Sequence, residues 1–329
     1  MITVGLVPGR LSVLSGRNRF AATSQQQSMS IAKLNADAID AYREAGAVLV
    51  ETMNEARKMI EPGVTQLEVA EYAEDAIHEA GAGLAFPVNI STDEAASHAT
   101  PARDDDTEFG DEMVCLDIGV HVDGYIADAA VTVDYTGHDD MVAAAEDALA
   151  AAVDAVGPGV DTGDVGREIE AAIDDYGYTP ILNLTGHGVE RYDAHTGPSI
   201  PNRAVDRGVE LEVGDVLAIE PFATDGRGKV GEGATEEIYE QVGDGSVRDR
   251  RARQVMEELE AFDDLPFAAR WLDSSRSAMA LRTLKNADIV KGYPVLKAAD
   301  GQLISQAEHT MIVTEDGCEV TTAGIHDFD

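Results

Sequence analysis

The sequence predicts an α+β protein made of two similar α/β halves, with a helical segment inserted into the second half. Helical patterns alternate with strand patterns along the chain, and a set of residues recurs at one offset of 96 positions. The matched positions are Pro62, Gly63, Val64, Val69, Ala76, Ile77 and Gly81, followed by Pro158, Gly159, Val160, Val165, Ala172, Ile173 and Gly177. So many matches at one spacing indicate an internal duplication. The two halves would then face each other across a pseudo-two-fold axis.

The elements of the two halves follow the same order. Apolar residues at helical spacing predict helices over 36–60 and 66–80 in the first half, each ended by glycine, and an alanine-rich helix over 141–156 in the second. Each repeat is followed by Gly-Asp and an apolar strand that contains one carboxylate, Asp117 in the first half and Glu220 in the second. We therefore expect both halves to contribute acids to the space between them.

The region 246–300 interrupts this order and is expected to be a helical insert. Short amphipathic helices are predicted over 250–262, 266–272 and 277–290, between a strand at 236–241 and a last strand at about 304–313. The domain prediction is therefore a catalytic domain formed by 29–245 and 301–329, with the insert at 246–300.

Residues 1–28 differ in composition from the rest of the chain. They contain three arginines and no acid, whereas about one residue in five of the whole chain is acidic. We expect 1–28 to be a disordered arm or a misread extension, with Met29 as the natural start. A functional basic tail is the alternative.

The charge balance excludes several classes of function. The chain has 62 acidic and 24 basic residues, a net charge of −38, and only six of the basic residues are lysine. Such a surface repels phosphate backbones and anionic lipid, so neither nucleic acid nor a membrane is an expected partner. Acid-rich, lysine-poor chains suit a salt-rich cytoplasm, where self-repulsion is screened. The sequence therefore predicts a halophilic, cytoplasmic protein. The two cysteines, Cys115 and Cys318, predict no disulfide framework.

The segment 114–133 is predicted to form a β-hairpin around the turn Asp123-Gly124. In that register Asp117 pairs with Ala130 and Gly119 pairs with Asp128, so Asp117 and Asp128 share one face. Two carboxylates at this spacing can bridge a pair of metal ions. On the hairpin alone, two solvated acids on an open sheet face explain the pattern equally well.

Other polar residues lie in apolar or glycine-rich surroundings. His187 stands between two glycines, with His195 eight residues later, while Glu220 and Glu308 each lie in an apolar strand pattern. His98 follows the segment Phe86-Pro87-Val88-Asn89. Together Asp117, Asp128, His187, Glu220 and Glu308 provide four carboxylates and one imidazole, a donor set that favours hard or borderline divalent ions over a thiolate zinc site.

Over residues 29–329 the chain resembles the type II methionine aminopeptidases of archaea and eukaryotes. The motifs that carry the resemblance are Phe86-Pro87-Val88-Asn89, His98-Ala99-Thr100-Pro101, Leu116 to Gly124, Gly186-His187, Ser199-Ile200-Pro201-Asn202, Ile219 to Ala223 and Ala307-Glu308-His309-Thr310. The resemblance implies the pita-bread metallopeptidase fold, which agrees with the duplication, and a helical insert at about 246–300 of the kind that separates type II from type I.

The resemblance also implies the roles of the site residues. Asp117, Asp128 and Glu308 would hold one metal, and Asp128 and Glu308 would bridge to a second metal that His187 and Glu220 complete. The ions would be Co, Mn, Fe or Zn, and they would make a water-derived nucleophile available near neutral pH. Glu220 would also carry the proton to the leaving amine.

The remaining implied roles concern the substrate. His98 and His195 would bind the scissile amide and stabilise the tetrahedral intermediate, and Phe86 would form one wall of a methionine pocket. Ala194 stands where the family usually has a larger aliphatic residue, which predicts a roomier pocket. The substrates would be nascent polypeptides that begin with methionine followed by a small residue, and the enzyme is expected to be a monomer.

Two alternatives remain within this fold. A Xaa-Pro dipeptidase would usually carry a further N-terminal domain. A binding protein without activity would usually have lost metal ligands, whereas all five ligand positions are intact here.

The charge predicts that stability depends on salt. Because the excess of acids leaves the folded chain repelling itself at low ionic strength, the melting temperature should rise as monovalent salt increases from about 0.1 M towards molar concentrations. Thermal unfolding followed by circular dichroism at a series of KCl concentrations measures this. A melting temperature that stays flat or falls over that range would exclude the halophilic interpretation.

Overall fold

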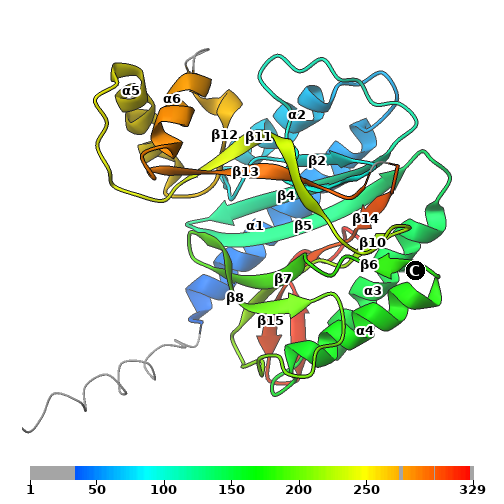
Figure 1. The fold of residues 1–329 in the computed structure, drawn as a ribbon. Helices are drawn as coiled ribbons and strands as arrows, with labels where there is room; N and C mark the ends of the chain where they lie inside the picture. Colours follow the sequence, from blue (N-terminus) through cyan, green and yellow to red (C-terminus); the bar gives the residue numbers. More distant parts are fainter. Residues whose placement is uncertain (1–33, 274–276, 300, 327–329) are drawn as a thin grey trace, which may run out of the picture. The chain divides into compact units, whose positions relative to one another are not determined.

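Two helix pairs and two antiparallel sheets make up most of the structure, as the duplication predicts (Figure 1). The computed structural model describes residues 34–273, 277–299 and 301–326. The extension predicted at 1–28 lies outside these residues, so its interpretation stays a prediction. Within the described part of the chain, no helix has the length and apolar character needed to cross a bilayer.

The first half packs two helices on one sheet. Helix α1 (Ala36–Ala56) begins at Asn35, whose side chain accepts a hydrogen bond from the Ala38 amide. Helix α2 (Gln66–Glu79) begins with a capping box between Thr65 and Glu68. The sheet has the order β1-β4-β2, with β5 paired to β4. Its strands are β1 (Gly83–Leu84), β2 (Asn89–Thr92), β4 (Met113–Val122) and β5 (Tyr125–Asp134).

The second half repeats this plan with its own core. Helices α3 (Asp139–Ala155) and α4 (Thr162–Asp175) pack on each other, and α4 also lies against β8. The main sheet has the order β16-β15-β9-β7-β8, and a small sheet has the order β14-β10-β6. The strands are β6 (Thr179–Pro180), β7 (Thr185–Glu190), β8 (Asp193–Pro201), β9 (Val216–Ile219), β10 (Phe222–Thr224), β14 (Ile304–Gln306), β15 (His309–Thr314) and β16 (Gly317–Val320).

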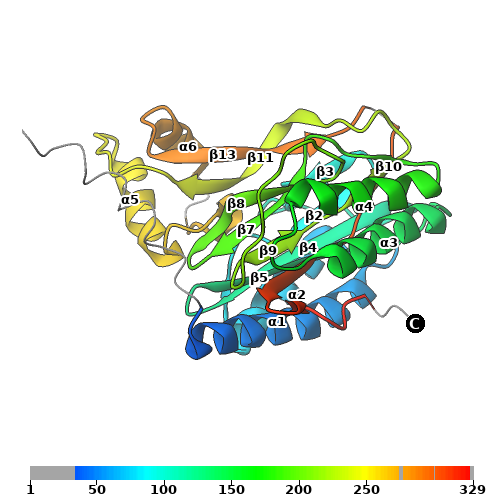
Figure 2. The ribbon, with the colours of Figure 1, turned by 90° about the horizontal axis from the view of Figure 1, so that it is seen from below.

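Each half buries its own group of apolar side chains. In the first, α1 packs on β4 and β5 while α2 packs on β1 and β2, and the core includes Leu49, Ile77 and Leu116. In the second, Leu149 and Leu217 lie in a separate core. Figure 2 shows the strands lying above α1 and α2, with the insert strands on the opposite side. The predicted fold class is confirmed: this is a mixed α/β protein with two similar halves.

The insert contains more strand than the sequence predicts. Helix α5 (Arg250–Leu259) and its short 3-10 extension, and helix α6 (Ser277–Lys285), agree with two of the three predicted helices. The helix predicted over 266–272 is wrong, because this segment forms β12 (Phe267–Ala268) and a single 3-10 turn, Ala269–Trp271. The backbone of β12 pairs with β11, which provides hydrogen-bond partners that a short helix would lack.

The third predicted helix is shorter than the sequence predicts, and a strand begins at its last predicted residue. Residues Val290–Lys297 form β13, which pairs with β11 (Gly231–Gln241) on one side and with β3 (Ala95–Ser97) of the first half on the other. The insert is therefore joined by its sheet to the segment that precedes His98. The domain boundaries at 246 and 300 stay a prediction.

The glycines beside His187 have a packing role. Gly186 and Gly188 both lie in strand β7 with neighbouring backbone close against them. A Cβ atom at Gly186 would lie 2.5 Å from the Ala218 carbonyl oxygen, and one at Gly188 would lie 2.1 Å from the Gly197 carbonyl oxygen. Glycine is needed here because the strands approach too closely for a side chain.

This close approach predicts the effect of a single methyl group. Gly188→Ala should lower the free energy of unfolding by about 1–3 kcal/mol, since β7 and β8 must separate to admit the Cβ atom. Urea unfolding at high salt measures the change. Gly231→Ala is the matched control, because no atom of the described residues lies within 4 Å of a Cβ placed there. Equal stability of the two variants would contradict the packing explanation.

Candidate active site

The β4–β5 hairpin places two acids beside each other. The register is the predicted one: Asp117 pairs with Ala130 and Gly119 pairs with Asp128. Both side chains are buried, with 9% of Asp117 and 3% of Asp128 exposed. Two solvated acids on an open sheet face are therefore excluded as an explanation of this pair.

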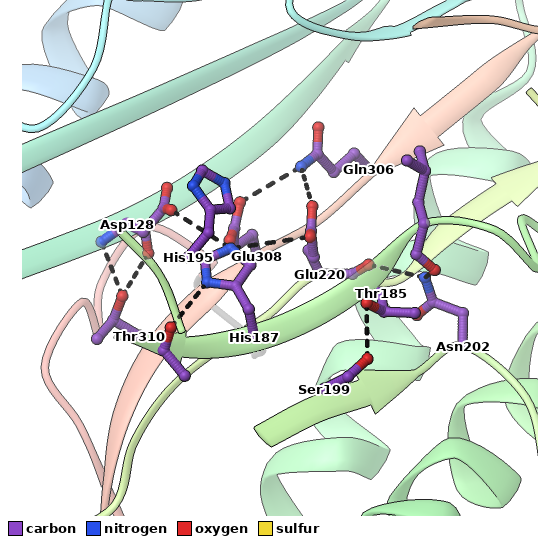
Figure 3. A network of polar contacts seen from close by, with 12 residues as sticks. Asp128, Thr185, His187, His195, Ser199, Asn202, Glu220, Gln306, Glu308 and Thr310 are labelled. Carbon is purple, nitrogen blue, oxygen red and sulfur yellow. Dashed lines mark hydrogen bonds and ion pairs between the residues drawn. The ribbon is translucent and has the colours of Figure 1, made fainter. Parts of the chain in front are cut away.

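The second half brings three further ligand candidates to the same place. The Nε2 atom of His187, on β7, lies 3.9 Å from an oxygen of Asp128 and 3.9 Å from an oxygen of Glu220 (Figure 3). Glu308 lies between β14 and β15, where the last strand of the sequence prediction is interrupted. One ligand atom each from Asp128, His187 and Glu308 lie within 4.8 Å of one another.

Burial makes this group of acids electrostatically unfavourable by itself. Burial raises the pKa of the Asp117 carboxyl to about 7. Burial and the neighbouring acid groups also raise the pKa of Asp128, Glu220 and Glu308. Burial lowers the pKa of His187 to about 4, so its imidazole is neutral near pH 7 and does not offset the acids.

The donor set fits a divalent metal. One oxygen each of Asp117, Asp128 and Glu308 is buried and has no hydrogen-bond partner among the described residues. Buried carboxylate oxygens without donors are costly unless a cation binds them. The neutral His187 imidazole is the form that ligates metal. Four carboxylates and one imidazole suit hard or borderline divalent ions.

Three residues outside the predicted set position the acids. Gln306 donates from Nε2 to Glu220 at 3.4 Å and to Glu308 at 3.3 Å, and the Thr310 hydroxyl bonds to both the amide and the carbonyl of Asp128. Asn202 donates to the Glu220 carbonyl oxygen. The spacing of two residues on either side of Glu308 could have identified Gln306 and Thr310, because residues 306, 308 and 310 all reach the site.

The side chain between Glu308 and Thr310 points away from the acids. The His309 Nδ1 atom lies 2.9 Å from the Thr322 hydroxyl, and its ring packs against that of His326. His309 therefore belongs to the packing behind the candidate metal centre.

All eight predicted site residues line one cavity of about 370 Å³. Phe86 forms part of its apolar wall, and it can lie there because Gly119 leaves room: a Cβ atom at Gly119 would lie 2.3 Å from the Phe86 ring. The His195 ring lies 4.4 Å from the His187 ring, between centroids. Burial lowers the pKa of His195 to about 3, and burial also lowers the pKa of His98. Both imidazole rings are therefore neutral near pH 7.

Ala194 does not line this cavity. It belongs to the same buried apolar cluster as Phe86 and Leu265, and it borders a second, polar cavity of about 340 Å³ that shares His195, Pro266 and Tyr293 with the first. The sequence suggested that the small residue at 194 widens the substrate pocket. The structure places Ala194 outside the walls of the main cavity, because alternate residues of a strand point to opposite sides.

Comparisons with known proteins agree with this geometry. The model of metallopeptidase family M24 matches residues 40–258. The methionine aminopeptidase of Archaeoglobus fulgidus is 47% identical over 281 residues, which is 85% of this chain and 96% of that protein.

Solved structures share the fold at low sequence identity. A thermophilic Arx1 has a TM-score of 0.77 at 18% identity, covering 88% of this chain and 91% of that one. The methionine aminopeptidase of Thermotoga maritima has a TM-score of 0.66 at 23% identity, covering 89% and 99%. The family match and the archaeal relative carry the assignment. This chain is a hydrolase of metallopeptidase family M24, and within that family it belongs to the archaeal methionine aminopeptidases.

Proposed function

We propose that this protein removes the N-terminal methionine from nascent proteins and peptides, that it needs divalent metal, and that it prefers a small second residue. The observation that carries the proposal is the convergence of four carboxylates and a neutral imidazole at a cavity that has an apolar wall. The relatives named methionine aminopeptidase support the choice of substrate.

Two ions would be held by the acids of both halves. Asp117, Asp128 and Glu308 would hold one ion, Asp128 and Glu308 would be shared, and His187 with Glu220 would complete the second site. Mn, Fe, Co and Zn all suit these ligands. When bound, such ions polarise the scissile carbonyl and supply a nucleophile from water near neutral pH.

The remaining chemistry belongs to the protein's own side chains. Glu220 would carry the proton to the leaving amine. Gln306 keeps Glu220 in place by its hydrogen bond. The Nδ1 N–H of His98 faces the Pro294 carbonyl, so the Nε2 atom of this neutral ring can accept from the scissile amide N–H. His195 can donate from a neutral ring to the charge that develops on the amide oxygen.

The substrate would enter with its first side chain against Phe86 and its free amine near the acids. An unbranched thioether fits an apolar wall, and a free amine is favoured beside carboxylates. The second residue would lie in the mouth between the two halves, where space is limited.

The cellular setting is proposed from charge alone. The excess of acids favours work in a salt-rich cytoplasm, as a monomer, without nucleic-acid or membrane partners. The change of melting temperature with KCl concentration tests this part of the proposal.

Metal dependence can be tested separately from catalysis. Chelation should abolish activity, and Mn²⁺ or Co²⁺ should restore it. Asp117→Asn and His187→Ala should lose bound metal and activity, while His98→Ala and His195→Ala should keep metal and lower kcat by roughly 10²-fold, as expected for loss of one transition-state hydrogen bond. Metal content by plasma emission spectroscopy and kcat are measured on the same samples.

His309→Ala is the control for this series, because His309 points away from the centre. It should keep most of its metal and activity. Full activity in chelated, metal-free protein would end the metal proposal, and loss of metal in His98→Ala or His195→Ala would make that residue a ligand.

A panel of peptides tests the substrate. At high salt with added Mn²⁺, Met-Ala-Ser and Met-Gly-Met should be cleaved, whereas Met-Trp and Met-Arg peptides should hardly react. Norleucine should replace methionine tolerably, since an apolar wall discriminates by only about 1–3 kcal/mol per methylene. An N-acetylated peptide should resist cleavage. Preferred cleavage of Xaa-Pro dipeptides would favour a dipeptidase, and no cleavage by metal-loaded protein would favour a binding function.

A further inference from the structure

A buried arginine of the insert reaches the segments that carry His98 and Phe86. Arg270 lies in the 3-10 turn after β12 and is only 8% exposed. Its guanidinium pairs with the buried Glu74 of α2, and the indole of Trp271 donates to the other oxygen of Glu74 at 2.9 Å. The insert is thus fixed to the first half by a buried ion pair.

The same guanidinium holds the chain just after His98. Its Nη1 atom donates to the Thr100 hydroxyl at 2.7 Å and to the Pro101 carbonyl at 2.9 Å. The Thr100 hydroxyl in turn donates to the Val88 carbonyl at 2.7 Å. Thr100 follows His98 by two residues, and Val88 follows Phe86 by two, so one hydroxyl connects Arg270 to both segments.

His98 requires such support because its backbone is in the left-handed region, with φ of 62°. A residue other than glycine adopts this conformation at a cost, and it persists where the surrounding structure fixes it. The Ala99 carbonyl accepts from the Ile90 amide at 2.7 Å, and the His98 Nδ1 atom lies 3.2 Å from the Pro294 carbonyl. The Arg270 contacts add a further constraint on the C-terminal side of the turn.

Burying Glu74 and Arg270 is costly. Burial raises the pKa of Glu74 and lowers that of Arg270, so desolvation opposes both charges. A planar guanidinium can donate to Glu74, Thr100 and Pro101 at the same time, which a lysine ammonium cannot match in geometry. The desolvation cost of Glu74 and Arg270 therefore accompanies a fixed hydrogen-bond geometry at the edge of the active site.

We propose that Arg270 is a positioning residue of the active site, which acts through the Thr100 hydroxyl to hold His98 in its working orientation. This inference rests on the proposed role of His98. It assigns the insert a part in the reaction, although Arg270 itself does not line the main cavity.

The test removes the Thr100 link while leaving the ion pair intact. In the full-length protein loaded with Mn²⁺, Thr100→Val should lower kcat for Met-Ala-Ser roughly tenfold, since small displacements of catalytic groups cost this much or more. Bound metal should be unchanged. Thr100→Ser keeps the hydroxyl and should retain near-normal kcat. Thr224→Val is the matched control, because Thr224 is also buried and its hydroxyl also donates to a backbone carbonyl, that of Leu303.

A double-variant cycle shows whether the effect passes through His98. Thr100→Val should lower kcat much less in the His98→Ala background than in the wild type, because residues that act as a unit are not additive. Arg270→Lys keeps a charge opposite Glu74 and should also lower kcat with metal retained. This variant therefore distinguishes the need for the planar guanidinium from the need for a positive charge at position 270.

The outcomes distinguish this inference from the proposed function. If His98→Ala lowers kcat but Thr100→Val or folded Arg270→Lys does not, the positioning role is overturned while the role of His98 stands. An equal loss from Thr100→Val in both backgrounds also overturns it. If His98→Ala itself keeps full activity, the proposed role of His98 fails first, and this inference fails with it.

Discussion

The structure depends on keeping four carboxylates and one neutral imidazole together in a largely buried place. Asp117, Asp128, Glu220 and Glu308 all have raised pKa values there, and buried oxygens of three of them have no donor among the described residues. Such a group is unfavourable until a cation neutralises it. The protein holds the acids in place by other means, through the Thr310 bonds to the Asp128 backbone and the Gln306 bonds to Glu220 and Glu308. The carboxylates that repel one another in the folded protein are thus the same groups that make the site suited to binding a metal ion.

Close backbone packing gives the site its geometry. Two acids come from a hairpin of the first half, while the imidazole and the other two acids come from the second half, so no local segment contains the centre. Gly186 and Gly188 let β8 and β9 approach β7, which fixes the position of His187 between them. Gly119 leaves room in the wall of the cavity, because the Phe86 ring occupies the space that a side chain at position 119 would need. Small residues at these points are therefore as important for the cavity as the polar residues that line it.

The insert is joined to the active site by both backbone and side chains. Its strand β13 pairs with β3, next to His98, and its Arg270 reaches the Thr100 hydroxyl two residues beyond. The Pro294 carbonyl, also on β13, lies beside the His98 ring. A histidine held in a left-handed conformation from three directions can present one ring nitrogen to a substrate reproducibly. The insert thereby contributes to the precision of a site whose candidate metal ligands all lie outside it.

The sequence by itself determined the duplication, the two helix pairs, the register of the 114–133 hairpin and eight of the residues that line the main cavity. Each depends on a local period, a two-residue turn or a motif, and such signals are written along the chain. The tertiary structure alone decided that Phe267–Ala268 and Val290–Lys297 are strands, because β11 and β3 supply their partners. It also decided that Ala194 faces away from the main cavity, and that Gln306, Asn202 and Arg270 support the site. These features arise from contacts between segments far apart in the sequence. Such a contact, whether a hydrogen bond or a close approach of backbones, produces no periodic pattern in the sequence of either segment.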